Sequence, residues 1–284
     1  MASDGAGWTV KYRRVLEISS TMDLPSDVAV DDQGRIYILD GTAGLVRVFN
    51  SHGGPLFTLG GAGVLHQPLG IDVNRAGDVL VADSGNHRLA LFPGGADNPR
   101  FFTLPPPAGG KPADPTDVHF APDNNSFIVV DNDNHRILAV NEQGKLLWAQ
   151  GCMGRNPGEF RFPFLLDIDR EGNIFVVEVI NTRVQVLLPD GTFKQFIGDW
   201  GIELGQFFRP KGIAVNEAGE VFVSDSYLGV VQIFDHTGEF LGVVADEYGT
   251  LKQFTTPVGM AVSGNHLFVV EMFTNRLLVL EKER

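Results

Sequence analysis

Short apolar runs, separated by turn residues, recur along the whole chain at intervals of about 47 residues. Each repeat opens at a proline, continues as an apolar run, a turn and a second apolar run that ends in an acidic residue, and closes with a third run. The opening prolines are Pro25, Pro68, Pro115, Pro163, Pro210 and Pro257. Such a period with strand patterning is typical of a β-propeller with one blade per repeat. We therefore predict an all-β fold, a six-bladed β-propeller formed by one domain over residues 1–284.

The fifth repeat illustrates the strands that we expect. Apolar runs cover residues 212–215, 220–225, 230–235 and 239–244, with turns at 216–219 and 236–238. The runs are mostly apolar and do not alternate cleanly with polar residues. Strands that are buried on both faces have this pattern, as expected where blades pack face to face.

The two ends of the chain complement each other. The sixth repeat stops after its third run, at residues 275–284, while residues 8–19 form a strand-like segment that precedes the first proline. We predict that residues 10–18 supply the missing outer strand of the last blade and close the ring, which removes an open sheet edge.

Two recurring motifs resemble those of NHL repeats. The connections at 151–163 and 198–210 share the form G-x2-G-x3-G-x-F-x2-P, and the second run ends in an acid that an arginine follows five residues later. The acid and arginine pairs are Asp83 and Arg88, Asp131 and Arg136, Glu178 and Arg183, and Glu271 and Arg276. The first and fifth repeats depart from this pattern, because Leu45 and Val230 stand at the arginine position. The resemblance covers nearly the whole chain and implies a propeller.

The resemblance constrains architecture more than activity. NHL proteins include ubiquitin-ligase and translational-repressor domains, receptor-kinase sensors, bacterial propellers of unassigned role, and peptidyl-hydroxyglycine lyases. The lyases place zinc-binding histidines directly after the opening proline. The residues at those positions here are Ser26, Leu69, Thr116, Phe164, Lys211 and Val258. None is histidine, so we do not expect that lyase activity.

The acid and arginine of each motif face each other across a hairpin. An arginine fork in this position can bond both the carboxylate and loop carbonyls. Four similar copies favour a role in blade architecture, since a catalytic site usually occurs once. His87 and His135 occupy equivalent positions in two of these motifs, and we interpret them as loop-stabilising variants.

Charge and cysteine content exclude several classes of function. The formal net charge is 22 − 35 = −13, which disfavours nucleic-acid binding. Cys152 is the only cysteine, so no intrachain disulfide and no paired-cysteine metal site can form. The sequence contains no run of 18 apolar residues, so it predicts no membrane-spanning helix. The start of the sequence lacks an apolar signal region, which fits a cytosolic protein or a mature exported one. Of the two we favour an exported bacterial protein, periplasmic or extracellular, whose signal peptide is not part of this sequence.

One metal candidate lies four residues after the opening prolines. Asp72, His119 and Asp167 occupy this position in three successive repeats, and carboxylate with imidazole can hold a divalent cation. The alternative interpretation is a hydrogen-bonded polar layer, and we expect no cofactor. Since no G-x-S-x-G, P-loop or H-E-x-x-H motif occurs, the enzyme alternative is a metal-dependent hydrolase or lyase, or a small-ligand sensor, centred on this channel.

The loops that follow the motif acids divide into a polar and an apolar half. Gly, Thr, Ser, Asn and Asp follow the acid in the first three repeats, whereas bulky apolar residues predominate in the last three. The predicted partner-binding residues are Phe164, Ile180, Tyr227, Leu228, Met272 and Phe273. A contiguous apolar sector on loop tips favours a docking surface, so we expect a non-catalytic scaffold that binds a protein partner. Membership of a larger assembly is one form that this binding can take. The alternatives are a plug at the channel mouth and a small-molecule pocket.

Overall fold

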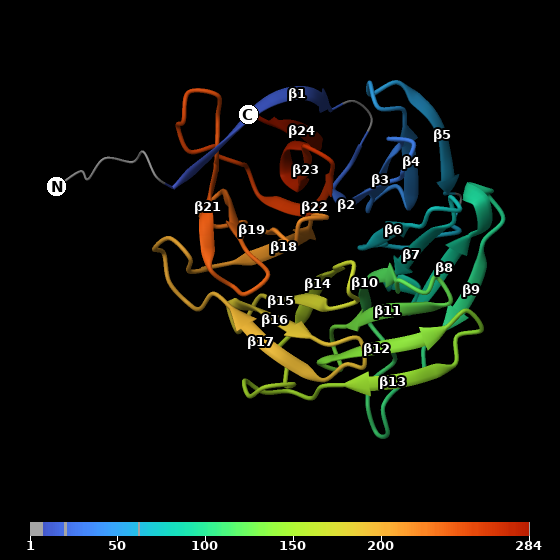
Figure 1. The fold of residues 1–284 in the computed structure, drawn as a ribbon. Helices are drawn as coiled ribbons and strands as arrows, with labels where there is room; N and C mark the ends of the chain where they lie inside the picture. Colours follow the sequence, from blue (N-terminus) through green and yellow to red (C-terminus); the bar gives the residue numbers. More distant parts are fainter. Residues whose placement is uncertain (1–7, 20–21, 62, 284) are drawn as a thin grey trace.

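The computed structural model describes residues 8–19, 22–61 and 63–283. Its strands form antiparallel sheets arranged around a central axis, as in a propeller (Figure 1). Four sheets have four strands each, and within each sheet the strands follow chain order. The first strand of every repeat contacts the first strands of its neighbours in a closed circle: β2, β6, β10, β14, β18, β22 and back to β2.

The strands of the first four repeats are bounded as follows. The first sheet contains β2 (Pro25–Val30), β3 (Ile36–Asp40), β4 (Leu45–Phe49) and β5 (Pro55–Gly60), and the second contains β6 (Ile71–Val73), β7 (Val79–Asp83), β8 (Arg88–Phe92) and β9 (Arg100–Thr103). The third contains β10 (Pro115–Phe120), β11 (Ser126–Asp131), β12 (Arg136–Asn141) and β13 (Leu146–Gln150), and the fourth contains β14 (Pro163–Ile168), β15 (Ile174–Glu178), β16 (Arg183–Leu187) and β17 (Phe193–Ile197). Short 3₁₀ turns occur at η1 (Ser84–Asn86), η2 (Pro93–Gly95) and η3 (Met272–Thr274).

The last two repeats share one eight-stranded sheet. It contains β18 (Pro210–Val215), β19 (Val221–Asp225), β20 (Val230–Phe234), β21 (Phe240–Ala245), β22 (Pro257–Ser263), β23 (His266–Glu271), β24 (Arg276–Lys282) and the N-terminal β1 (Thr9–Ile18). From Tyr12 to Ile18, β1 pairs antiparallel with β24, the position expected from the sequence. Thr9–Lys11 also pairs parallel with β21, which was not expected. The sequence predicts six separate sheets; the structure has five, because β1 joins the last two repeats.

The middle strands are buried on both faces, which explains their continuous apolar runs. Every residue of β3, β7, β15 and β19 is buried. The core lies between adjacent sheets, as where Tyr37 and Val46 of the first repeat pack with Val81 and Phe92 of the second. The buried hydroxyl of Tyr37 donates a hydrogen bond to Asp31 at 3.0 Å, so this core position leaves no polar atom unsatisfied.

The residue before each motif arginine has a left-handed backbone. The φ angle is 56° at His87, 54° at His135, 55° at Thr182 and 52° at Asn275. The two repeats that lack the arginine have glycine at this place, Gly44 and Gly229, also with positive φ. The tight hairpin therefore selects residues that tolerate the left-handed region, and histidine there does not by itself indicate a binding site.

Candidate functional site

The six motif acids are completely buried at the ends of the second strands, and five of them bind an arginine. Arg88 lies 2.7 Å from Asp83, Arg136 lies 2.8 Å from Asp131, and Arg276 contacts Glu271. The far end of the guanidinium donates to a loop carbonyl, as in the 2.7 Å bond from Arg88 to Val64. The acid and arginine therefore attach the connecting loop to its sheet, and the architectural interpretation is confirmed.

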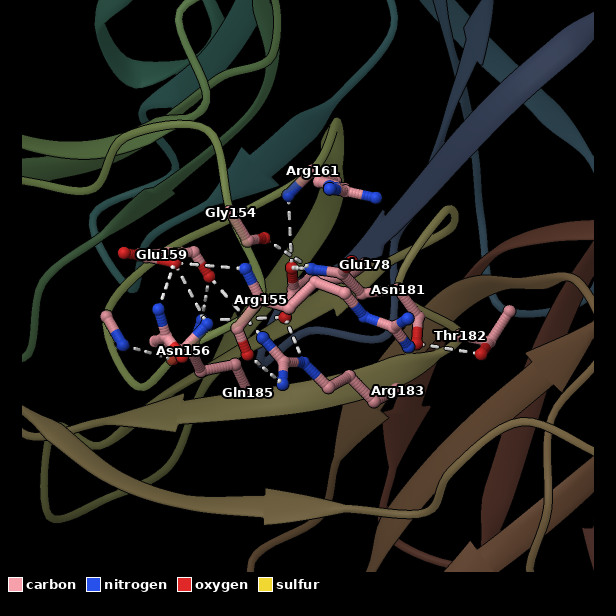
Figure 2. A network of polar contacts seen from close by, with 11 residues as sticks. Gly154, Arg155, Asn156, Glu159, Arg161, Glu178, Asn181, Thr182, Arg183 and Gln185 are labelled. Atoms are coloured by element: carbon pink, nitrogen blue, oxygen red, sulfur yellow. Dashed lines mark hydrogen bonds and ion pairs between the residues drawn. The ribbon is translucent and has the colours of Figure 1, made fainter.

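Figure 2 shows the fullest version of this network, in the fourth repeat. Glu178 accepts from Arg183 at 2.6 Å and from the amide of Arg161 at 3.1 Å, and Arg183 also donates to the carbonyl of Arg155. Within the same loop, the Glu159 carboxylate accepts the backbone amides of residues 155 and 156, both at 3.0 Å. These contacts hold the shape of the loop, although the buried Nε of Arg161 has no hydrogen-bond partner among the described residues.

The two repeats that depart from the motif replace the missing arginine differently. In the first repeat, Arg47 reaches Asp40 from two residues farther along β4, at 2.8 Å. In the fifth repeat, Asp225 accepts only backbone amides, from residues 208, 209, 227 and 228. Gln232 then bonds to the connecting loop through the Gly205 amide and the Gln206 carbonyl.

The central channel is lined by four carboxylates that join neighbouring repeats. Each accepts the backbone amide of the next first strand: Asp27 from Ile71, Asp72 from Phe120, Asp117 from Leu166 and Asp167 from Val215, at 2.6–3.1 Å. They alternate between two positions of the repeat, two and four residues after the proline. Between them is a cavity of about 160 Å³.

His119 lies among these carboxylates. Its Nδ1 is 3.7 Å from Asp72 and 3.6 Å from Asp167, and its Nε2 is 3.8 Å from Asp117. Burial alone lowers the pKa of His119, but the carboxylates of Asp72, Asp117, Asp167 and Asp27 outweigh that effect and raise the pKa to about 9. Burial raises the pKa of Asp117 to about 7, although the positive charge of His119 opposes that rise.

The structure brings the three metal candidates, Asp72, His119 and Asp167, together. Across the described residues, however, no group of three or more His, Cys, Asp or Glu side chains has an arrangement suited to a metal ion. In both Asp72 and Asp167 the two oxygens already accept backbone amides. The cluster thus forms a polar layer of hydrogen-bonded carboxylates around one imidazolium.

The predicted partner-binding residues differ in exposure. Ile180, Tyr227 and Phe273 are 57%, 64% and 68% exposed. Phe164, Leu228 and Met272 are half-buried, and Phe164 and Met272 pack against the core. The first three residues face solvent as a docking surface requires, while the other three border the interior.

Sequence reasoning missed further exposed apolar residues in the loops of the last three repeats. Ten large apolar side chains are exposed on the loops after β15, β19 and β23 and on the connections before Pro163, Pro210 and Pro257, and we call them the apolar half-face: Met153, Phe162, Ile180, Trp200, Ile202, Leu204, Tyr227, Tyr248, Leu251 and Phe273. A usable signal existed, because Met153 and Trp200 hold the same third position of the G-x2-G motif. Tyr227 stacks against Phe208 with ring centroids 4.3 Å apart, so this aromatic is partly preorganised.

Lys211 is a cation at the inner edge of the apolar half-face. Its Nζ lies over the Phe164 ring, 4.2 Å from the centroid. Burial lowers the pKa of Lys211, and the neighbouring Arg209 lowers it further. Within the described ranges, Lys211 and Arg209 form no ion pair with an acidic side chain.

The two motif histidines, His87 and His135, hold their loops through opposite tautomers of the neutral ring. His87 Nδ1 lies 2.9 Å from the Ala113 carbonyl oxygen, which only accepts, so Nδ1 carries the proton. His135 Nδ1 accepts the Phe162 amide at 3.2 Å, so its proton is on Nε2. In keeping with this, burial lowers the pKa of His135. Both histidines stabilise loops, as the sequence suggests.

Comparisons with known proteins agree with this architecture. Residues 65–92 match the NHL repeat family model. NHL repeat-containing protein 3 of Mus musculus is 27% identical over 192 residues, which cover 59% of this chain and 50% of the relative. The chain therefore spans about half the length of that curated relative. The recognition of NHL repeats is confirmed by the match at residues 65–92 and by the similarity to an NHL repeat-containing protein.

Solved structures of enzymes share the fold. A gluconolactonase from Xanthomonas campestris superposes with a TM-score of 0.71 at 15% identity, over 96% of this chain and 95% of the other. A virginiamycin B lyase from Staphylococcus aureus superposes with a TM-score of 0.70 at 12% identity, over 96% of this chain and 99% of the other. At these identities the likeness shows the fold alone. No helix in the described parts of the chain is long and apolar enough to cross a membrane.

Proposed function

We propose that the protein is a non-catalytic docking propeller that binds a protein partner through the apolar half-face. We count the eight-stranded sheet as two blades joined by β1, which gives one six-bladed domain. The observation that carries the proposal is the concentration of exposed apolar side chains on the loops of the last three repeats. Exposed apolar side chains that gather on one part of a surface are typical of interaction sites.

The composition of the surface supports a protein partner. Trp200, Tyr227 and Tyr248 are 67%, 64% and 82% exposed, and Trp and Tyr are the residues that most often dominate binding energy at interfaces. Their loops are held by the buried acids beneath them, so docking requires little ordering of the surface.

The positive charges of Lys211 and Arg209, at the inner edge of the apolar half-face, indicate which chemical groups a partner would carry. Lys211 and Arg209 are unpaired within the described residues of a chain whose net charge is −13. An acidic side chain or carboxylate of the partner would complement them next to the aromatic contacts. We therefore propose that the partner segment combines apolar residues with one acidic group.

Photo-crosslinking tests the proposal directly. A benzophenone amino acid at position 227 should capture a partner in a lysate of the source organism, whereas the same group at position 147, which is also exposed but lies on the outer strand β13, should not. Equal capture at both positions would contradict a specific surface.

Double substitution then separates docking from a plug at the channel mouth. Tyr227→Ser with Phe273→Ser should abolish capture by a crosslinker at position 200 and change the melting temperature by less than about 2 °C. Leu147→Ser with Leu241→Ser is the matched control on outer strands and should leave capture intact. A large fall in melting temperature for the first pair would support the plug instead.

A further inference from the structure

A second hollow opens on the polar half of the loop face, over the first two repeats. Its volume is about 720 Å³, within the range of small-molecule sites. Ser26 and Leu69 at the loop end of the channel line it, and Asp114 of the third repeat and Met272 of the sixth complete its walls. It is separate from the apolar half-face and from the carboxylates deeper in the channel.

Small residues after the motif acids make room for this hollow. Gly41 and Thr42 follow Asp40, and Ser84 and Gly85 follow Asp83. A Cβ at Gly85 would lie 2.4 Å from His66 Nδ1, so only glycine lets the His66 ring take its place in the wall. The small polar residues of these loops therefore leave a cavity on this half of the loop face.

His87 lines the hollow, and its Nδ1 is already engaged by a loop carbonyl. Because Nδ1 donates its proton to the Ala113 carbonyl, the neutral ring has its lone pair on Nε2. His135, at the equivalent place in the next repeat, uses Nδ1 as the acceptor, so the free lone pair distinguishes His87.

The Asp114 carboxylate is a second acceptor in the same wall. Its backbone amide bonds to Asp131 at 2.9 Å, but within the described part of the chain its carboxylate oxygens receive no hydrogen bond. Asp114 is half-buried, and burial raises its pKa, with the charges of Asp133 and Asp131 adding to the effect. A charged His87 is near enough to lower that pKa, and within the described residues the two groups form no direct ion pair.

One part of the remaining wall is apolar and contains Leu65, Pro68, Leu69 and Met272, while Ser26, Thr42, Gln67 and Ser84 contribute polar groups elsewhere. A ligand that fits must therefore place hydrogen-bond donors toward His87 and Asp114 and a hydrocarbon face against the leucines. A negatively charged group is unfavourable beside Asp114 in a chain of net charge −13.

We propose that this hollow is a binding site for small organic amines, in which the ammonium group donates to the Asp114 carboxylate and His87 Nε2 and the hydrocarbon part packs on the leucine wall. This site goes beyond the proposed docking function and does not depend on it.

Three ligands of the same size test the charge preference: benzylamine, benzyl alcohol and benzoate. Titration followed by protein NMR should give saturable binding of benzylamine with a dissociation constant of roughly 1 mM, weaker binding of benzyl alcohol and no binding of benzoate. Absence of saturable benzylamine binding, or binding of benzoate at equal strength, would overturn the proposal.

Two variants locate the site. Asp114→Asn should weaken benzylamine about tenfold or more and reduce its preference over benzyl alcohol, and His87→Asn should weaken both. Asparagine is chosen because Asn275 holds the same left-handed position in the sixth repeat. The control is His135→Asn, which should leave binding unchanged. Unchanged affinity in both Asp114→Asn and His87→Asn, with unchanged melting temperatures, would place any binding elsewhere and refute the assignment.

Discussion

Arg47 occupies, from a different place in the sequence, the role that the motif arginine has in four other repeats. Its Nε donates to the buried carboxylate of Asp40 at 2.8 Å, two residues beyond the usual position. Residues two apart on a strand lie on the same face. The shift therefore preserves the direction of the guanidinium. The first repeat differs from the motif in the sequence position of its arginine, but it forms the same ion pair.

We predict that Arg47→Ala destabilises the protein by about 2–4 kcal/mol, because it leaves Asp40 as a completely buried charge without its counterion. Chemical denaturation of the variant and the parent measures the difference. Arg75→Ala, which removes an exposed ion pair with Asp32, should cost less than about 0.5 kcal/mol. Similar losses in the two variants would show that burial of Asp40 is unimportant.

The channel imidazolium predicts a pH dependence of stability. The pKa of His119 is about 9 in the folded protein, above its ordinary value of 6.5. The stabilisation is therefore complete below pH 6.5 and is lost as pH rises through 9. Asp117, with a pKa raised to about 7 from 3.8, acts in the same direction, but most of its contribution is lost before pH 7. The free energy of unfolding should fall by about 1–3 kcal/mol between pH 6.5 and 9.5.

His119→Gln should lower stability at pH 6.5 and flatten this profile. His236→Gln, at an exposed histidine of the fifth repeat, should leave the profile unchanged. Urea unfolding at several pH values gives the comparison. A parent protein that is equally stable at pH 6.5 and 9.5 would mean that the channel carboxylates do not hold a proton on His119.

The N-terminal strand should be essential to stability. Deleting residues 1–18 removes β1 and exposes the edges of both β24 and β21, and it also removes Tyr12 from the core. We expect the melting temperature to fall by more than 10 °C, since a buried aromatic alone contributes about 3–5 kcal/mol. A synthetic peptide of residues 8–19 added in excess should restore part of the loss. An unchanged melting temperature would refute the role of β1.

Close contact between the first strands depends on glycine. A Cβ at Gly70 would lie 2.2 Å from Asp117 Oδ1 and 2.6 Å from the Asp117 Cα, so Gly70→Ala should force the second and third repeats apart. We expect a loss of more than about 3 kcal/mol by denaturation. Gly109→Ala has open space but a positive φ, and should cost only about 1 kcal/mol. Equal losses would mean that the contact between Gly70 and Asp117 can relax at little cost.

The periodic features could be predicted from sequence because each repeat restates them. Strand bounds in the fifth repeat agree within two residues, for example Val230–Phe234 against the expected 230–235. The sequence did not predict that Arg47 takes the role of the arginine missing at position 45. That role depends on the face of β4 on which the Arg47 side chain lies. The double pairing of β1 depends on the approach of two sheets that no local pattern records.

The candidate sites divide in the same way. The clustering of Asp72, His119 and Asp167 follows from their equal place in successive repeats, and the structure brings them together. The hydrogen bonds from backbone amides of the next first strand to the oxygens of Asp72 and Asp167 were not predictable, because they depend on the distance between neighbouring sheets. Equally, His87 and His135 look identical in sequence, and only their partners, a carbonyl and an amide, distinguish them.

The position of β1 also determines when this strand can pair while the chain is being synthesised. Ile18 pairs with Leu277, so β1 meets its antiparallel partner only after about 260 further residues have been synthesised. At about 5–20 residues per second, that interval is roughly 13–50 s. Throughout it, the earlier repeats can assemble while the N-terminal segment keeps an unpaired edge. A nascent chain stalled before residue 276 should therefore be a preferred client for chaperones that recognise exposed strands.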